Sequence, residues 1–305
     1  MKKHIITFLA ATLCLMAPAT MWGQKKDATK KKAAAEVTYP QRDSDFKPDY
    51  KLKPIGSFNP DNVTNIEYTL VPAPDFTGHL LKRDPSRKQV KLTQQWCGAN
   101  EIVDDEWWFE KNDLTKREER VETPMNQFGP RFRYRTGGYL VTTYGEDWGY
   151  TMNVVITDEA QETLYAAYYF VNFKYSPKTT LMGNYQSVND FVIEGNILYV
   201  AHGSNSYSDG AGYQTGYLTA FDMEKQEIIW TTQPMTCNSH IAIVGNSIIC
   251  GYGFTSEPDY LFILDKYSGQ RVKRIPVKKM VNEVVPKGDL LYVRTYSYDY
   301  LFKIE

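Results

Sequence analysis

The chain has few cysteines, no strong excess of charge of either sign, and no long apolar run beyond its first residues. Its 305 residues include 4 Cys, 4 His, 35 Lys or Arg and 36 Asp or Glu, which gives a formal net charge of −1. This balance argues against a general nucleic-acid-binding protein. No segment after the N-terminus is long and apolar enough to form a transmembrane helix.

Motifs of the common catalytic chemistries are also missing. The chain contains no Gly-x-Ser-x-Gly nucleophile turn and no phosphate-binding glycine loop. His79, His202 and His240 lie far apart and lack the spacing typical of zinc ligands. We therefore predict no metal and no cofactor, and a non-catalytic protein is the leading interpretation.

The cysteines do not predict a disulfide framework. An exported chain of this length does not need disulfides to support its core. If Gly245 and Asn246 form a hairpin turn, Ile241 and not Cys237 lies opposite Cys250. We expect the cysteines to be small buried apolar residues.

What the chain does have is aromatic and β-favouring. Aromatic residues make up 14% of the sequence, and the 23 Tyr outnumber the 14 Phe and 6 Trp together. Tyrosine favours strands and half-exposed surfaces, so the composition indicates a β-rich domain.

The N-terminal residues predict a secretory signal peptide followed by a spacer. Residues 1–23 have a basic start, an apolar stretch and small residues, which is typical of a secretory signal. We expect an exported protein of a Gram-negative bacterium, either periplasmic or associated with the outer membrane or cell surface. Residues 24–51 form a basic flexible linker, a spacer or a tether to anionic envelope material. Residues 56–305 hold 24 cations and 31 acids, so a basic tail precedes an acidic body.

One pattern recurs through the C-terminal half. A strand, a turn ending in Gly-Asn or Gly-Asp, and a second strand follow one another three times. Glycine before Asn or Asp adopts a positive φ easily, which suits a tight hairpin. The three hairpins cover 191–201, 241–251 and 284–294.

Further hairpins, such as 217–230 and 260–275, follow the first two of these, which gives repeats of about 40–50 residues, the length of a propeller blade. We predict an all-β fold, a single β-propeller over residues 52–305 with six four-stranded antiparallel blades, five or seven being left open. The last unit lacks a fourth strand, and a strand from the N-terminal region would supply it and close the ring. The expected units are 52–95, 96–125, 128–180, 185–235, 238–276 and 280–305.

A family resemblance rests on two of these hairpins. Tyr260 to Gln270 resembles the quinoprotein-type propeller repeat, whose turn reads Asp-x-x-Thr/Ser-Gly-Lys/Gln, and Tyr217 to Trp230 resembles it with its trailing Trp. The resemblance covers residues 187–305 best. It implies a PQQ-repeat-like bacterial envelope β-propeller, similar to non-enzymatic members such as the outer-membrane-assembly propeller lipoprotein.

Polar residues align at the start of the first strand of several units. Aligning the Gly-Asn and Gly-Asp turns places Asn189, Ser239 and Asn282 at one position, and Asp190, His240 and Glu283 at the next. The first strand of each blade lines the central channel, so these residues are expected near one channel mouth. We expect a polar network around channel water, a small-ligand or cation site, or a partner contact.

Loops with aromatic residues are expected at the same channel mouth. Trp148 and Tyr150 lie in one loop, and Tyr207, Asp209 and Tyr213 lie in the longest loop. Exposed Tyr and Trp among small polar residues suit protein or sugar contacts. Asp104, Asp105 and Glu106, beside two tryptophans, read as a turn that enters a buried strand.

The sequence therefore predicts an exported, non-catalytic β-propeller that acts as a protein-interaction scaffold in the cell envelope. Another envelope protein is the expected partner, with surface glycan second. The alternatives are a small-ligand or glycan-binding or glycan-processing propeller, or a quinoprotein-like oxidoreductase. The last would need a basic residue beside Asp190, His240 and Glu283, and the repeats show none.

Overall fold

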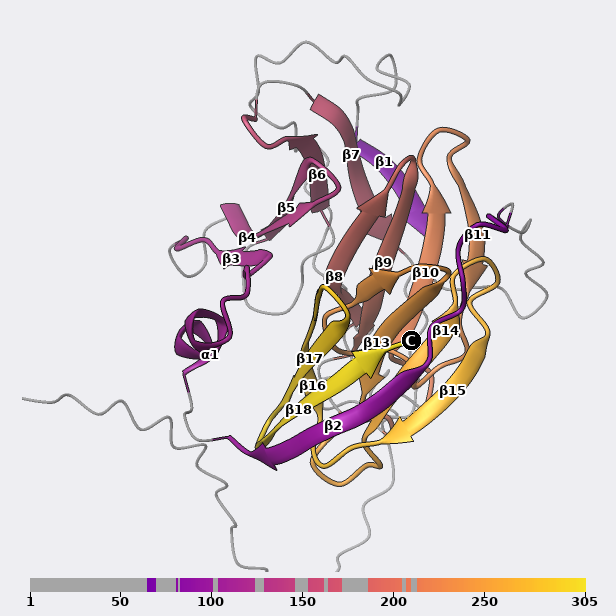
Figure 1. Cartoon of the computed structure of the whole chain (residues 1–305). Coiled ribbons are helices and arrows are strands. Elements are labelled where there is room, and N and C mark those ends of the chain that lie inside the picture. Colours follow the sequence, from indigo (N-terminus) through magenta and orange to yellow (C-terminus); the bar gives the residue numbers. More distant parts are fainter. Residues whose placement is uncertain are drawn as a thin grey trace, which may run out of the picture. The chain divides into compact units, whose positions relative to one another are not determined.

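The computed structural model describes residues 65–69, 81, 83–100, 104–123, 129–145, 153–161, 164–171, 186–204, 207–209 and 213–305. All described residues belong to one compact unit, which spans Thr38–Glu305. They form eighteen strands in four sheets, with one helix (Figure 1). No helix in this part of the chain is long and apolar enough to span a membrane.

Two sheets are consecutive four-stranded meanders, which we call blade 2 and blade 3. Each begins with a hairpin whose turn has glycine at a positive φ, +63° at Gly195 and +59° at Gly245. A positive φ at the first turn position matches the twist of the flanking strands. Blade 2 contains β8 (Gln186–Glu194), β9 (Ile197–Ser204), β10 (Tyr217–Asp222) and β11 (Glu227–Thr231), and blade 3 contains β12 (Ala242–Val244), β13 (Ser247–Tyr252), β14 (Tyr260–Asp265) and β15 (Arg271–Pro276).

Blade 1 is the same meander with an added strand on each side. β3 (Glu118–Arg120) pairs with the first strand of the meander, and β1 (Asn65–Thr69) pairs in parallel with the last. The inner edge of blade 1 is therefore β3. The meander contains β4 (Gly129–Thr136), β5 (Tyr139–Gly145), β6 (Asn153–Asp158) and β7 (Leu164–Val171).

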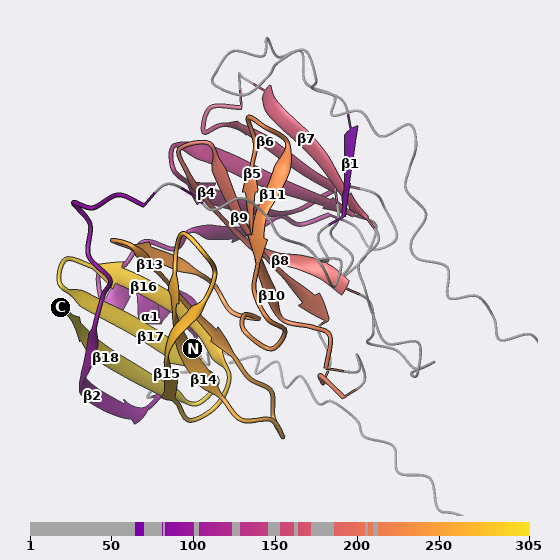
Figure 2. The same ribbon diagram turned by 90° about the vertical axis from the view of Figure 1, so that its right-hand side faces the viewer.

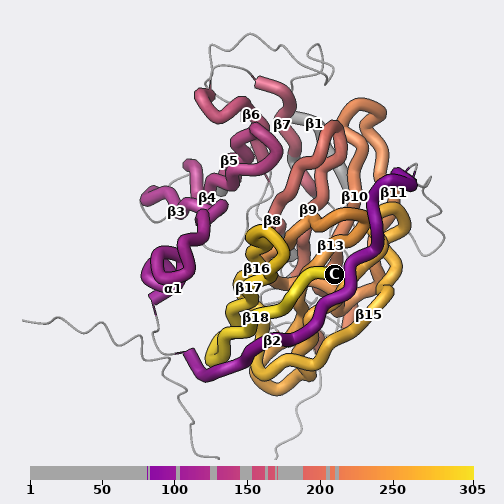
Figure 3. The backbone as a smooth tube through the Cα atoms, in the orientation of Figure 1, coloured from indigo at the N-terminus to yellow at the C-terminus, as the bar shows by residue number. Residues whose placement is uncertain are grey.

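Blade 4 joins the two ends of the described chain. β16 (Val281–Lys287), β17 (Leu290–Thr295) and β18 (Tyr298–Ile304) form a meander, and β2 (Leu92–Ala99) adds the fourth strand. Tyr300 pairs with Cys97, although about two hundred residues separate them. Figures 2 and 3 show β2 running beside β18 near the C-terminus. The expectation that a strand from earlier in the chain completes the last blade is confirmed.

Helix α1 (Asp105–Lys111) leads from blade 4 to blade 1. The side chain of Asp104 accepts a hydrogen bond from the backbone N–H of Glu106 at 2.9 Å, and acidic residues occupy the first turn. These are favourable helix-start features. The strand expected after Asp104–Glu106 is therefore wrong, because a capped helix forms instead, with Trp108 and Phe109 buried.

Successive blades pack face to face through apolar clusters. The cluster between blades 1 and 2 includes Tyr168 and Phe221. The cluster between blades 2 and 3 includes Tyr199 and Phe262, and the cluster between blades 3 and 4 includes Ile263. The first strands of neighbouring blades also contact one another, β4 with β8 and β12 with β16. The four sheets thus share one hub, to which each contributes its inner strand.

This architecture confirms the all-β propeller and four of the expected units, those over 128–180, 185–235, 238–276 and 280–305. The unit expected over 96–125 is wrong as a separate blade, because its residues supply β2 to blade 4, then α1, then β3 to blade 1. Four blades are described, and the expected number of six is not confirmed.

Cys237 and Cys250 are free and buried, as expected of small apolar residues, whereas Cys97 is free but only half-buried. Ala242 pairs with Ile249 in the β12–β13 hairpin, so the register brings Ile241 opposite Cys250.

Candidate functional site

The aligned asparagines mark a repeated irregularity of the inner strands. The pairing register shifts between Val188 and Asp190 in β8, and between Val281 and Glu283 in β16. Asn189 and Asn282 are therefore the extra residues of two β-bulges at the same position of two blades, the kind of bulge that re-aims neighbouring side chains.

The bulges carry hydrogen bonds between blades. The hydroxyl of Tyr134 in blade 1 donates to the carbonyl oxygen of Asn189 at 3.0 Å. The backbone N–H of His240, just before β12, donates to the carbonyl oxygen of Asn282 at 3.1 Å. Both asparagines thus help to tie the hub together through their backbones.

The ionisable residues next to the bulges lie close together. His240 Nδ1 lies 2.7 Å from Glu283 Oε2, and His240 Nε2 lies 2.6 Å from Glu118 Oε2. Asp190 Oδ2 accepts the backbone N–H of Ile241 at 2.8 Å. Blades 1 to 4 each contribute to this group, which we call the hub cluster: Arg117, Glu118, Asp190, His240 and Glu283.

Arg117 and Glu118 were missed by the sequence analysis. Arg117 Nη2 lies 2.6 Å from Asp190 Oδ2 and 3.3 Å from the carbonyl oxygen of Ile241, and the guanidinium also donates to the carbonyl oxygen of Phe191. Both residues enter the hub at the start of β3, in a segment that was assigned to a separate blade. The only signal was the charged run Lys116 to Arg120 after the acidic helix.

Burial and the neighbouring carboxylates have opposite effects on the pKa of His240. Burial disfavours the imidazolium, but Asp190, Glu283 and Glu118 outweigh it and raise the pKa of His240 well above its ordinary value. The neighbouring carboxylates therefore favour the imidazolium form of His240. The hub cluster then has two cations and three carboxylates, almost all engaged with one another.

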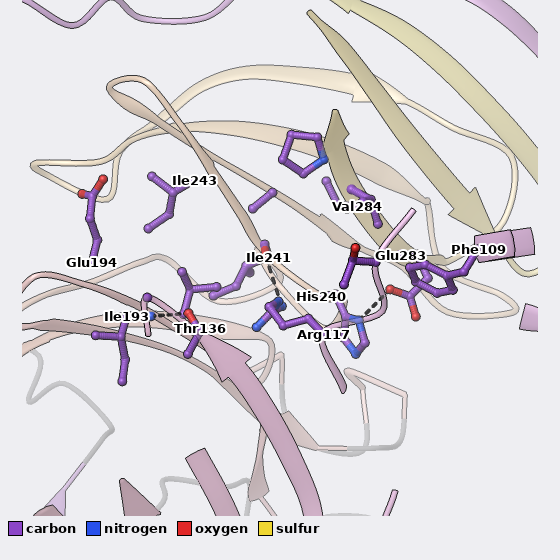
Figure 4. Close-up of a pocket in the computed structure, with 16 residues that line it drawn as sticks. Phe109, Arg117, Thr136, Ile193, Glu194, His240, Ile241, Ile243, Glu283 and Val284 are labelled. Carbon is purple, nitrogen blue, oxygen red and sulfur yellow. Dashed lines mark hydrogen bonds and ion pairs between the residues drawn. The ribbon is translucent and has the colours of Figure 1, made fainter. Parts of the chain in front are cut away.

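A cavity of about 340 Å³ lies beside the hub cluster (Figure 4). Arg117, His240 and Glu283 line one side of it, and Glu194 also lies in its wall. Much of the remaining lining is apolar and comes from the inner strands, as with Ile241, Ile243 and Val284. One oxygen of Asp190, Oδ1, is buried without a hydrogen-bond partner in the described part of the chain. No group of three or more His, Cys, Asp or Glu among the described residues is placed to hold a metal ion.

The other expected site residues belong to the loops that join second and third strands. Tyr207, Asp209 and Tyr213 lie between β9 and β10. The ring of Tyr207 packs on that of Phe254, between β13 and β14, with centroids 4.9 Å apart. Trp148 and Tyr150 lie outside the described residues.

A carboxylate links the same two loops. Glu257 Oε1 accepts the backbone N–H of Ser208 at 2.6 Å, and Glu257 Oε2 accepts the hydroxyl of Tyr252 at 2.9 Å. Tyr207 and Tyr213 are 39% and 58% exposed, and Tyr296, in the equivalent turn of blade 4, is 74% exposed. We call these three tyrosines the loop face.

Four blades around a charged hub define this chain as a β-propeller protein. No protein-family model and no curated protein sequence matches the chain. The quinoprotein-type repeat therefore stays a prediction.

The solved structures that resemble parts of the chain include two crystal structures. One is described as the crystal structure of BamB from Moraxella catarrhalis, with a TM-score of 0.36 and 14% identity over 56% of this chain and 42% of that chain. The other is the crystal structure of a mitotic checkpoint complex, with a TM-score of 0.36 and 11% identity over 55% of this chain and 47% of that chain. The chain thus matches less than half the length of either structure. A likeness this weak carries no conclusion about function.

Proposed function

We propose that this chain is an exported, non-catalytic β-propeller that binds a protein partner of the bacterial cell envelope through its loop face. The observation that carries the proposal is the exposure of Tyr207, Tyr213 and Tyr296, at 39%, 58% and 74%. Large exposed aromatic side chains are enriched where proteins bind one another, because each buries much area with few rotatable bonds.

The part of the loop face around Tyr207 is also held in place before binding. The Tyr207–Phe254 ring contact and the bonds to Glu257 join the loops of blades 2 and 3. Side chains that are already ordered lose less conformational entropy when a partner binds. This order supports a binding surface in preference to a loose surface loop.

The hub supports a scaffold more than a catalyst. Arg117 is engaged by Asp190 and two carbonyl oxygens, and both nitrogens of His240 are engaged by carboxylates. Groups already paired in this way hold the blades together and are poorly available as acids or bases for a substrate. Export rests on residues 1–23, and any blade beyond the four described belongs to the proposal.

The test uses a photo-crosslinking amino acid at position 213 or 296 in living cells, followed by purification of the crosslinked partner. The purified partner is then titrated against the wild-type chain and Tyr207→Ala/Tyr213→Ala. We expect the double variant to bind about tenfold more weakly or worse. Trp96→Ala is the matched control, because Trp96 is 50% exposed but lies on β2. Equal affinity of the wild-type chain and the double variant would refute the loop face as the binding surface.

A small ligand in the hub cavity is the second candidate. The cavity volume of about 340 Å³ and the side chains of Arg117, His240 and Glu283 in its lining favour it. Thermal-shift measurements with sugars, with amines, and with a quinone and Ca²⁺ would test it. Stabilisation that disappears in His240→Gln would support it, and no stabilisation by any of these compounds would reject it.

A further inference from the structure

The outer strand of blade 3 concentrates positive charge on an acidic body. No Asp or Glu occurs between Gln270 and Asn282, whereas residues 56–305 as a whole hold 24 cations and 31 acids. Five exposed cations fill this stretch, on β15 and just after it: Arg271, Lys273, Arg274, Lys278 and Lys279. We call them the basic rim.

Little of the charge of the basic rim is neutralised within the described part of the chain, although Asp259 interacts electrostatically with Lys279. None of its five side chains forms an ion pair with a described carboxylate. Burial and the nearby charge of Arg274 lower the pKa of Arg271. An acidic partner would relieve this crowding of like charges.

Aromatic rings support several of these cations. The guanidinium groups of Arg271 and Arg274 lie 4.7 Å and 4.5 Å from the ring centroids of Phe262 and Tyr260, and Lys278 Nζ lies 4.6 Å from that of Tyr298. Arg271 also donates to Thr236 Oγ1. Cation–π contacts of this kind hold long side chains in place, so the surface is partly ordered before a partner arrives.

β15 is also an edge, and edge strands add further strands readily. Within the described residues it pairs only with β14. Cations often protect such edges from aggregation. Protection alone does not explain the basic rim, because β2 has no charged residue and β11 has one acid, although both are outer strands. Blade 1 shows that an outer strand of this fold accepts another, since β1 adds to β7.

We propose that β15 is a docking strand for an extended acidic segment of a partner protein, which adds to blade 3 as a fifth strand. Backbone hydrogen bonds would supply affinity, and carboxylates beside Lys273, Arg274, Lys278 and Lys279 would supply specificity. Val272, 52% exposed among the cations, favours a segment in which acidic and apolar residues alternate. This inference is independent of the loop face.

The test uses the full chain and a fluorescent peptide of alternating Glu and Val, eight residues long, titrated by anisotropy at low salt. We expect saturable binding that weakens as salt is added. Lys273→Glu/Lys278→Glu should weaken binding by about tenfold or more. Lys88→Glu/Lys303→Glu makes the same change of charge at exposed positions outside the basic rim and should leave affinity within about twofold.

Peptides with backbone N-methyl groups separate strand addition from simple charge attraction. Methylation of alternate residues blocks the hydrogen bonds of one peptide edge only. One of the two alternating patterns should abolish binding, and the other should be tolerated. Equal binding of both patterns would overturn strand addition. No peptide binding would overturn the proposal, as would binding only to vesicles rich in phosphatidylglycerol or to a sulfated polysaccharide.

Discussion

At the scale of single residues, the hub cluster holds several buried charges in one small volume. Asp190 is fully buried and Arg117 is 23% exposed, so their ion pair is poorly screened by water. Removal of one partner from such a pair leaves an uncompensated buried charge, which costs more than the intact pair contributes. The hub cluster therefore stabilises the propeller only while it is complete.

Arg117→Met should lower the free energy of unfolding by about 3–5 kcal/mol, because Asp190 loses its counter-ion. Urea denaturation measures this change. Arg135→Met is the control, because the Arg135–Glu119 pair is about half exposed and should contribute at most about 1 kcal/mol. Arg117→Met/Asp190→Asn should recover part of the loss. Equal losses in Arg117→Met and Arg135→Met would contradict a structural role for the hub pair.

Stability should fall as pH rises above the ordinary pKa of histidine. The folded state holds the His240 proton more tightly than the unfolded state, whose pKa is about 6.5. The stabilisation is therefore complete below about pH 6.5 and is lost as pH rises through the folded pKa, by at most about 1.4 kcal/mol per pH unit. Urea midpoints between pH 6 and 9 should show this slope in the wild-type chain and a flatter one in His240→Gln. Identical slopes would count against a charged His240.

At the scale of elements, blades 3 and 4 are in close contact at a glycine, which has no side chain to keep the strands apart. A Cβ atom at Gly251 of β13 would lie 2.3 Å from Val281 Cβ of β16. Such a distance is far inside van der Waals contact, so blades 3 and 4 would have to separate. The backbone of Gly251 needs no positive φ, so packing alone excludes a side chain here.

Gly251→Ala should destabilise the chain by about 1–3 kcal/mol through overpacking. Gly251→Ala/Val281→Ala should recover part of this, because it removes the methyl groups that clash. Gly288→Ala is the comparison, since its Cβ would meet no atom within 4 Å and only its φ of +61° is unfavourable. Thermal melts of the three variants would measure the effect. A Gly251→Ala variant as stable as the wild-type chain would contradict this contact between blades.

At the scale of the whole molecule, β2 decides whether the propeller closes. The strand comes from the start of the described domain and completes the blade formed by its last residues. Pairing chain segments that are so far apart in sequence costs a large loop-closure entropy when the chain folds. A covalent link between the segments would lower the entropy of the unfolded chain and so reduce this cost.

A disulfide between β2 and β18 should therefore stabilise the whole domain. Thr93 and Lys303 are opposite one another in the register, which suits the spacing of a disulfide. Oxidised Thr93→Cys/Lys303→Cys, made in a Cys97→Ser background, should be more stable than its reduced form by about 3–5 kcal/mol. Melting with and without dithiothreitol measures the difference. Unchanged melting would show that this closure is not a stabilising element of the folded state.

Short-range sequence patterns were sufficient to predict most of the blades. Glycine turns such as Gly195-Asn196 and Gly245-Asn246, flanked by alternating apolar residues, fix the hairpins and their register through short-range geometry. The alignment of Asp190, His240 and Glu283 followed from that register alone. The same local geometry kept Cys237 out of register with Cys250.

Long-range pairing is what the sequence by itself left undetermined. Residues 92–99 and 118–120 have too little pattern of their own to show which sheet they join, so the separate unit over 96–125 was an error. Those two segments bring Arg117 and Glu118 into the hub and complete blade 4. Their partners lie tens to hundreds of residues away, and only the packing of the folded blades selects them. Hairpin register is a local property of the chain, whereas closure of the ring and the charge balance of its hub belong to the tertiary structure.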